Sequence, residues 1–92
     1  MNPTLSQQAK PSDDVLFQEV GGEAVLLNLA TESYFGLDPV GTRIWMLLKQ
    51  DAHLQNAYEA MIAEYEVDPV LLEADLLVLV GKLAEAGLVT VE

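Results

Sequence analysis

The chain has 92 residues, of which 51% are hydrophobic, and its 15 acidic and 4 basic side chains give a formal net charge of -11. A chain of this length forms one domain, because it is too short to bury the surface that two independent cores require. The excess of carboxylates repels phosphate backbones, so nucleic acid is not expected as a partner.

The sequence also lacks the marks of membrane and secreted proteins. No apolar run approaches the roughly 18 to 20 residues that cross a bilayer, and the N-terminus has no basic segment followed by an apolar one. The chain contains no cysteine, which removes disulfides, thiolate nucleophiles and cysteine metal ligands together. We therefore expect a cytoplasmic protein that does not contact a membrane.

The N-terminal residues 1–13 differ in composition from the rest of the chain. They contain two prolines and mostly polar side chains, and Leu5 is their only sizeable apolar side chain besides Met1. Such a segment offers too little apolar surface to order itself. The sequence therefore predicts a flexible tail over 1–13 and a single domain over 14–92.

The next part of the chain has the pattern of a small antiparallel sheet. Two β-favouring runs, 15–20 and 24–29, lie on either side of Gly21-Gly22, which is typical of a hairpin. After a turn at 30–33, the aromatic pair Tyr34-Phe35 predicts a brief third strand that ends at Gly36.

Three helices follow. Asp38-Pro39 and Asp68-Pro69 each combine a capping carboxylate with a proline suited to the first helical position. Asp51 is the expected cap of the helix between them, which ends near Tyr65, and Gly87 is the expected left-handed residue after the third and longest helix. A three-stranded antiparallel sheet followed by three helices predicts an α+β fold of the winged helix-turn-helix type.

Three further expectations concern packing. Ile44 and Trp45 fall in the middle of the first helix, where the helices meet, so we assign both to the core. Arg43 is expected to pair with an acid of the third helix such as Asp75. Residues 88–91 alternate weakly and either return as a short strand or pack as a tail.

No catalytic constellation is visible. His53 is the only histidine, and zinc needs three or four suitably placed ligands, so no metal site is expected. No serine has a histidine at a spacing that connects the two, and Gly21-Gly22 is not a phosphate-binding loop. We expect no enzymatic activity and no cofactor. DNA binding is also disfavoured, because the second helix contains no Lys or Arg between His53 and Tyr65.

The ordered part of the sequence resembles the PqqD-like family, the recognition elements of pathways that make ribosomally synthesised and modified peptides. The segments that carry the resemblance are EAVLLNLA (23–30), SYFGL (33–37), GTRIW (41–45), YEVDP (65–69), ADLL (74–77) and LAEAGL (83–88). Members of the quinone cofactor pathway have a proline-glutamate pair after the leucines of the second strand. Asn28-Leu29-Ala30 stands here instead, which favours an adaptor for another modified peptide.

The resemblance implies a non-catalytic adaptor that binds the leader of a precursor peptide by β-strand addition. It presents this leader to a modifying enzyme, such as a radical SAM maturase or a cyclase. The leader would add to the free edge of the third strand and lie against the third helix. The implied peptide-binding residues are Ser33, Tyr34, Phe35, Gly36, Leu71, Asp75, Val78 and Lys82. The alternative is a structural or oligomerisation module without a peptide ligand, in which the exposed surface of the third helix forms a homodimer.

Overall fold

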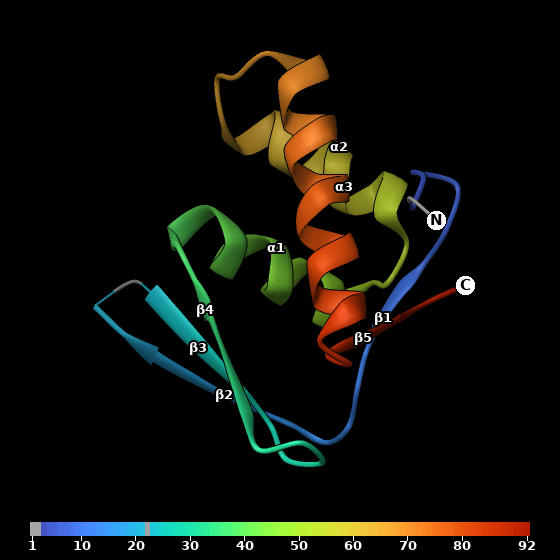
Figure 1. Cartoon of the computed structure of the whole chain (residues 1–92). Helices are drawn as coiled ribbons and strands as arrows, with labels where there is room; N and C mark the ends of the chain where they lie inside the picture. The colour runs from blue at the N-terminus through green and yellow to red at the C-terminus, as the bar shows by residue number, and fades with distance from the viewer. Residues whose placement is uncertain (1–2, 22) are drawn as a thin grey trace.

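The computed structural model describes residues 3–21 and 23–92 and shows a small sheet beside three helices (Figure 1). In chain order the elements are β1 (Ala9–Pro11), β2 (Val15–Val20), β3 (Glu23–Asn28), β4 (Ser33–Leu37), α1 (Pro39–Gln50), α2 (Leu54–Glu64), α3 (Pro69–Glu85) and β5 (Val89–Val91). The predicted α+β fold, with three antiparallel strands followed by three helices, is confirmed. In the part of the chain that is described, no helix is long and apolar enough to span a bilayer.

The three central strands form an antiparallel sheet in the order β2-β3-β4. Along β3, the side chains of Ala24, Leu26 and Asn28 are buried, whereas Glu23 and Val25 between them are exposed. Strand geometry produces this alternation, because successive side chains point to opposite faces of a sheet. One face of the sheet therefore packs on the helices, and the other is turned to solvent.

The two aspartate-proline pairs begin α1 and α3 as expected. The Asp38 carboxylate accepts a hydrogen bond from the Gly41 amide at 2.7 Å, and Asp68 accepts one from the Val70 amide at 2.9 Å. Gly87 follows α3 with a φ of 74°, the left-handed conformation that glycine adopts without steric cost.

The start of α2 differs from the prediction, because its N-cap is His53 and not Asp51. Asp51 lies just before the helix, where its carboxylate accepts hydrogen bonds from the His53 amide, the His53 ring and Asn56. The His53 amide, then its ring and then Asn56 lower the pKa of Asp51 to about 2.

The core contains Ile44 and Trp45, each 2% exposed, as expected from their place in the first helix. Arg43, on the same helix, turns toward the end of α2, where its Nε donates to the Glu64 carboxylate at 2.9 Å. This contact raises the pKa of Arg43 and lowers that of Glu64. The expected pairing of Arg43 with Asp75 is wrong. The carboxylate that accepts from Arg43 belongs to Glu64 at the end of α2, whereas Asp75 lies on α3.

The first residues of the described chain pack on the domain. Ala9 is fully buried, its amide donates to the Ala52 carbonyl at 2.8 Å, and β1 pairs with β5 at the other end of the chain. The composition of residues 1–13 predicts a flexible tail outside the domain. The structure instead places a strand there, because the pairing partner of this segment comes from residues 89–91 and cannot be recognised from local composition.

A buried asparagine joins the sheet to the end of α3. The Asn28 side-chain amide donates to the Ala86 carbonyl at 2.9 Å, and its oxygen accepts from the Ala30 amide at 3.0 Å. A Cβ atom at Gly87 would lie 3.0 Å from the same Asn28 nitrogen. Gly87 therefore gives both the left-handed turn and the space that this contact needs.

We predict that Asn28→Ala lowers the free energy of unfolding by about 1 to 3 kcal/mol, because it leaves the Ala86 carbonyl and the Ala30 amide without a partner. Urea unfolding followed by the fluorescence of Trp45 measures the change. The control is Asn56→Ala, which removes an exposed asparagine and should cost less than about 0.5 kcal/mol. Equal effects of the two variants would contradict a structural role for Asn28.

A second prediction tests whether residues 9–11 belong to the folded domain. Ala9→Asp places a carboxylate at a fully buried position and should destabilise the chain by at least about 2 kcal/mol, whereas Lys10→Asp, at the exposed neighbouring position, should have little effect. Thermal unfolding of both variants gives the comparison. If the segment were a flexible tail, the two melting temperatures would match that of the parent chain.

Candidate functional site

The strand β4 lies at one edge of the three-stranded sheet. It pairs with β3 along one side, and within the described residues no strand pairs with its other side. Figure 1 shows β4 on the side of the sheet that faces α3. Its backbone therefore offers unpaired N-H and C=O groups to an added strand, next to a helix.

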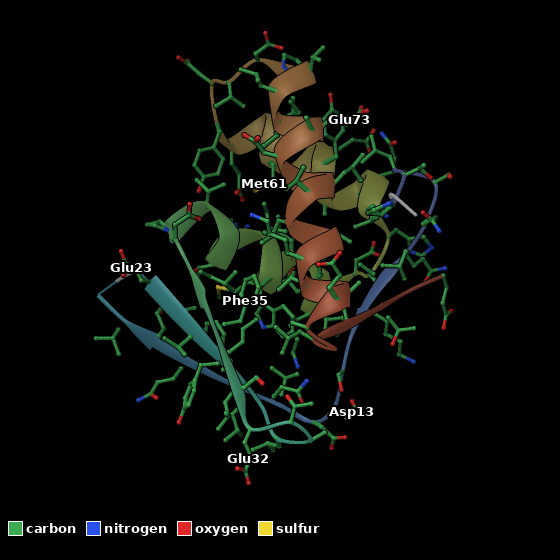
Figure 2. All side chains as sticks on the ribbon, viewed as in Figure 1. Asp13, Glu23, Glu32, Phe35, Met61 and Glu73 are labelled. Carbon is green, nitrogen blue, oxygen red and sulfur yellow. The ribbon has the colours of Figure 1, made fainter. Side chains whose placement is uncertain are left out.

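A groove of about 510 Å³ lies between β4, the start of α1 and α3. Its apolar part includes the half-buried ring of Phe35, which projects from β4 toward the helices (Figure 2), and the buried side chain of Ile44. The full lining is Phe35, Gly36, Leu37, Asp38, Val40, Gly41, Ile44, Asp75, Leu79 and Lys82. The groove thus has an apolar floor with polar groups at its rim.

Four of the sequence-predicted residues meet in this groove, namely Phe35, Gly36, Asp75 and Lys82. Asp75 and Lys82 come together because residues seven apart lie on nearly the same face of a helix. Asp75 is about 10 Å from Lys82 along the helix axis, at 1.5 Å per residue. Both side chains are exposed, and neither takes part in an ion pair among the described residues.

The other predicted residues do not line the groove. Ser33 and Tyr34 belong to β4, but Tyr34 is 74% exposed and points to the face opposite Phe35, because successive strand residues alternate. Leu71 and Val78 are 62% and 57% exposed on the outer flank of α3. Val78 borders a different depression, which it shares with Pro3 and Gly81.

The start of α1 contributes to the groove, which the sequence did not predict. Asp38, Val40 and Gly41 line the groove at the point where β4 turns into the helix. The Asp38-Pro39 cap was visible in the sequence, but a cap does not reveal which groove it borders. Leu79 could have been found from its spacing, since it lies four residues after Asp75 and three before Lys82.

The lining of the groove suits the binding of a ligand with both apolar and charged groups. The charged residues of the lining are Asp38, Asp75 and Lys82; the Asp38 carboxylate accepts a hydrogen bond from the Gly41 amide, whereas Asp75 and Lys82 make no ion pair among the described residues. No group of three or more His, Cys, Asp or Glu side chains is placed to hold a metal ion in residues 3–21 and 23–92. An extended peptide segment matches the unpaired strand edge, the apolar floor and the two opposite charges.

Comparison with curated proteins finds no match. Among solved structures, the chain is similar to a protein described as "TbiB1 in Complex with the TbiA(beta) Leader Peptide", with 42% identity and a TM-score of 0.81 over 87% of this chain and 93% of that one. It also shares its fold with "Lasso peptide synthetase B1 complexed with the leader peptide", with 21% identity and a TM-score of 0.76 over 92% and 98% of the two chains.

The model of one protein family, described as "Coenzyme PQQ synthesis protein D (PqqD)", matches residues 23–89. The match extends from β3 through the first residue of β5 and so includes β4, α1 and α3, the elements that form the groove. This chain therefore belongs to the PqqD family.

Proposed function

We propose that the chain is a non-catalytic adaptor that binds the leader of a ribosomally synthesised precursor peptide and presents it to a modifying enzyme. The observation that carries this proposal is the unpaired edge of β4 beside the groove with the Phe35 floor and the Asp75 and Lys82 rim. The similar protein TbiB1, at 42% identity, is described in complex with a leader peptide, which supports the same ligand class here.

The leader binds as a fourth strand next to β4. Four strand-pairing hydrogen bonds contribute about 2 to 6 kcal/mol in total at roughly 0.5 to 1.5 kcal/mol each. Ordering a disordered segment costs on the order of 2 to 5 kcal/mol, so backbone pairing by itself gives little net affinity. The side chains that enter the groove therefore decide which leader binds and how tightly.

In this proposal the chain acts in the cytoplasm, where precursor peptides are synthesised, and the chemistry belongs to a separate enzyme such as a radical SAM maturase or a cyclase. Asn28-Leu29-Ala30 replaces the proline-glutamate pattern of the quinone pathway members. The proposed precursor is accordingly one whose product is a modified peptide other than the quinone cofactor.

Addition of the leader as a strand next to β4 should change the NMR signals of β4 and of the neighbouring part of α3. In a titration of ¹⁵N-labelled chain with precursor leader peptides, including the TbiA(beta) leader, we expect shifts at the amides of 33–36 and 75–82. The amides of β4 should also exchange more slowly with solvent once the added strand covers them. Shifts confined to other parts of the chain, or none with any leader, would contradict the proposed site.

Charge-reversal variants distinguish an effect of the groove residues on leader binding from an effect of the overall net charge of the protein. Asp75→Lys should weaken leader binding about three- to tenfold, because it reverses the charge of the carboxylate that α3 contributes to the groove. Glu73→Lys is the matched control, since it makes the same change of net charge on the same helix, and Glu73 points away from β4 in Figure 2.

Lys82→Glu should likewise weaken binding, and Lys10→Glu, on β1, is its control. Isothermal titration calorimetry with the leader peptide measures all four variants. Equal effects of groove and control substitutions would mean that only net charge matters.

A further inference from the structure

The opposite edge of the sheet, formed by β2, is also unpaired among the described residues. This strand exposes apolar side chains on both of its faces, with Leu16 at 55%, Phe17 at 40% and Val20 at 70% exposure. Its sequence, VLFQEV, contains no lysine or proline, the residues that commonly protect a free edge from pairing. An exposed edge with this composition is suited to pairing with another strand.

A second groove lies beside this edge, on the helix side of the sheet. Phe17 pairs with the fully buried Leu26 and so points toward the helices. There it lines a groove of about 290 Å³ together with Trp45, Met46, Lys49 and Gln50 of α1. Trp45 is buried and forms the floor, whereas Phe17 and Met46 are each about two-fifths exposed and form the walls. The groove has room for one large apolar side chain.

The charged residue at this groove is basic, whereas the net charge of the protein is negative. Lys49 is the one charged residue of its lining, in a chain with 15 acidic and 4 basic side chains. Arg43 is already paired with Glu64, whereas Lys49 makes no ion pair within residues 3–21 and 23–92. An isolated ammonium group at the rim of an apolar groove favours a ligand that brings a carboxylate next to its apolar side chain.

We propose that the β2 edge and this groove form a second docking site, which takes an extended segment of a protein partner. The partner segment pairs its backbone with β2, places a large apolar side chain against Phe17, Trp45 and Met46, and sets a carboxylate near Lys49. Outside that carboxylate the partner surface is neutral or basic, because the net charge of -11 repels an acidic surface. The same repulsion disfavours a second copy of this chain as the occupant.

The two docking sites lie on opposite edges of one sheet, with β3 between them. Strands two positions apart in a sheet are about 10 Å apart, so segments at β2 and β4 do not compete for the same backbone groups. Both sites can be filled at once, and the sheet then has five strands. The proposal for β2 rests on its own edge and groove and does not depend on the ligand proposed for β4.

Short synthetic peptides test the proposal. One probe is a ten-residue peptide of alternating threonine and valine with a central phenylalanine and a glutamate two residues later, and its partner probe has lysine in place of that glutamate. In titrations of ¹⁵N-labelled chain, the glutamate peptide should shift the amides of 15–20 and the indole N-H of Trp45. The lysine peptide should bind about three- to fivefold more weakly. Lys49→Glu should reverse this preference.

Met46→Asp should abolish the shifts, and Val70→Asp is its control, because both residues are exposed apolar residues on helices and only Met46 lines the groove. A chain already saturated with a leader peptide at β4 should bind the glutamate peptide equally well. The proposal is overturned by shifts at β4 in place of β2, by equal binding of the two peptides, or by no binding. Self-association of the free chain that broadens the β2 signals would also overturn it, by identifying a second copy as the occupant.

Discussion

The buried side chain of Asn28 is a polar connection between the sheet and the end of the long helix, beside the apolar core that the two share. This buried amide is hydrogen-bonded on one side to the residue that ends α3 and on the other to the turn between β3 and β4. Because β4 follows that turn directly, the same contact fixes the edge of β4 relative to α3. Asn28 thus helps to hold β4 beside α3, although it is not among the residues that line the groove.

The start of α1 forms a further part of the groove lining. The chain leaves β4 at Leu37 and begins α1 at Pro39, with Asp38 between them as the cap. A capped start fixes the direction of the first helical turn, and Val40 and Gly41 in that turn line the groove. One short connection thus ends the strand, begins the helix and forms part of the groove lining.

Much of the fold could be predicted because its signals are local. A glycine pair between two apolar runs and two Asp-Pro starts each act within a few residues, and the structure has a hairpin and two helices at those places. The β1–β5 pairing could not be predicted, because the three residues Ala9-Lys10-Pro11 are too few to show a strand pattern and their partner is at the other end of the chain. The ion pair of Arg43 was misplaced for a similar reason, since the sequence does not show which helix its side chain faces.

Part of the candidate site could also be predicted from local signals. Helical spacing placed Asp75 and Lys82 on one face, and the aromatic strand supplied Phe35. Leu71 and Val78 share the helical spacing but are not among the residues that line the groove, and only the packing of α3 against the sheet distinguishes these positions.

The pairing of β1 with β5 brings the two ends of the chain together. The Gln8 amide donates to the Glu92 carbonyl at 3.1 Å, and the Glu92 amide donates back to Gln8 at 2.9 Å. Proteins with adjacent ends tolerate circular permutation, in which a short linker joins the original ends and the backbone is opened elsewhere. Opening the connection between α2 and α3 at the exposed residues Glu66 and Val67 would leave both sheet edges and the Asp68 cap intact, and a reporter domain could then be attached at a point that lines neither groove.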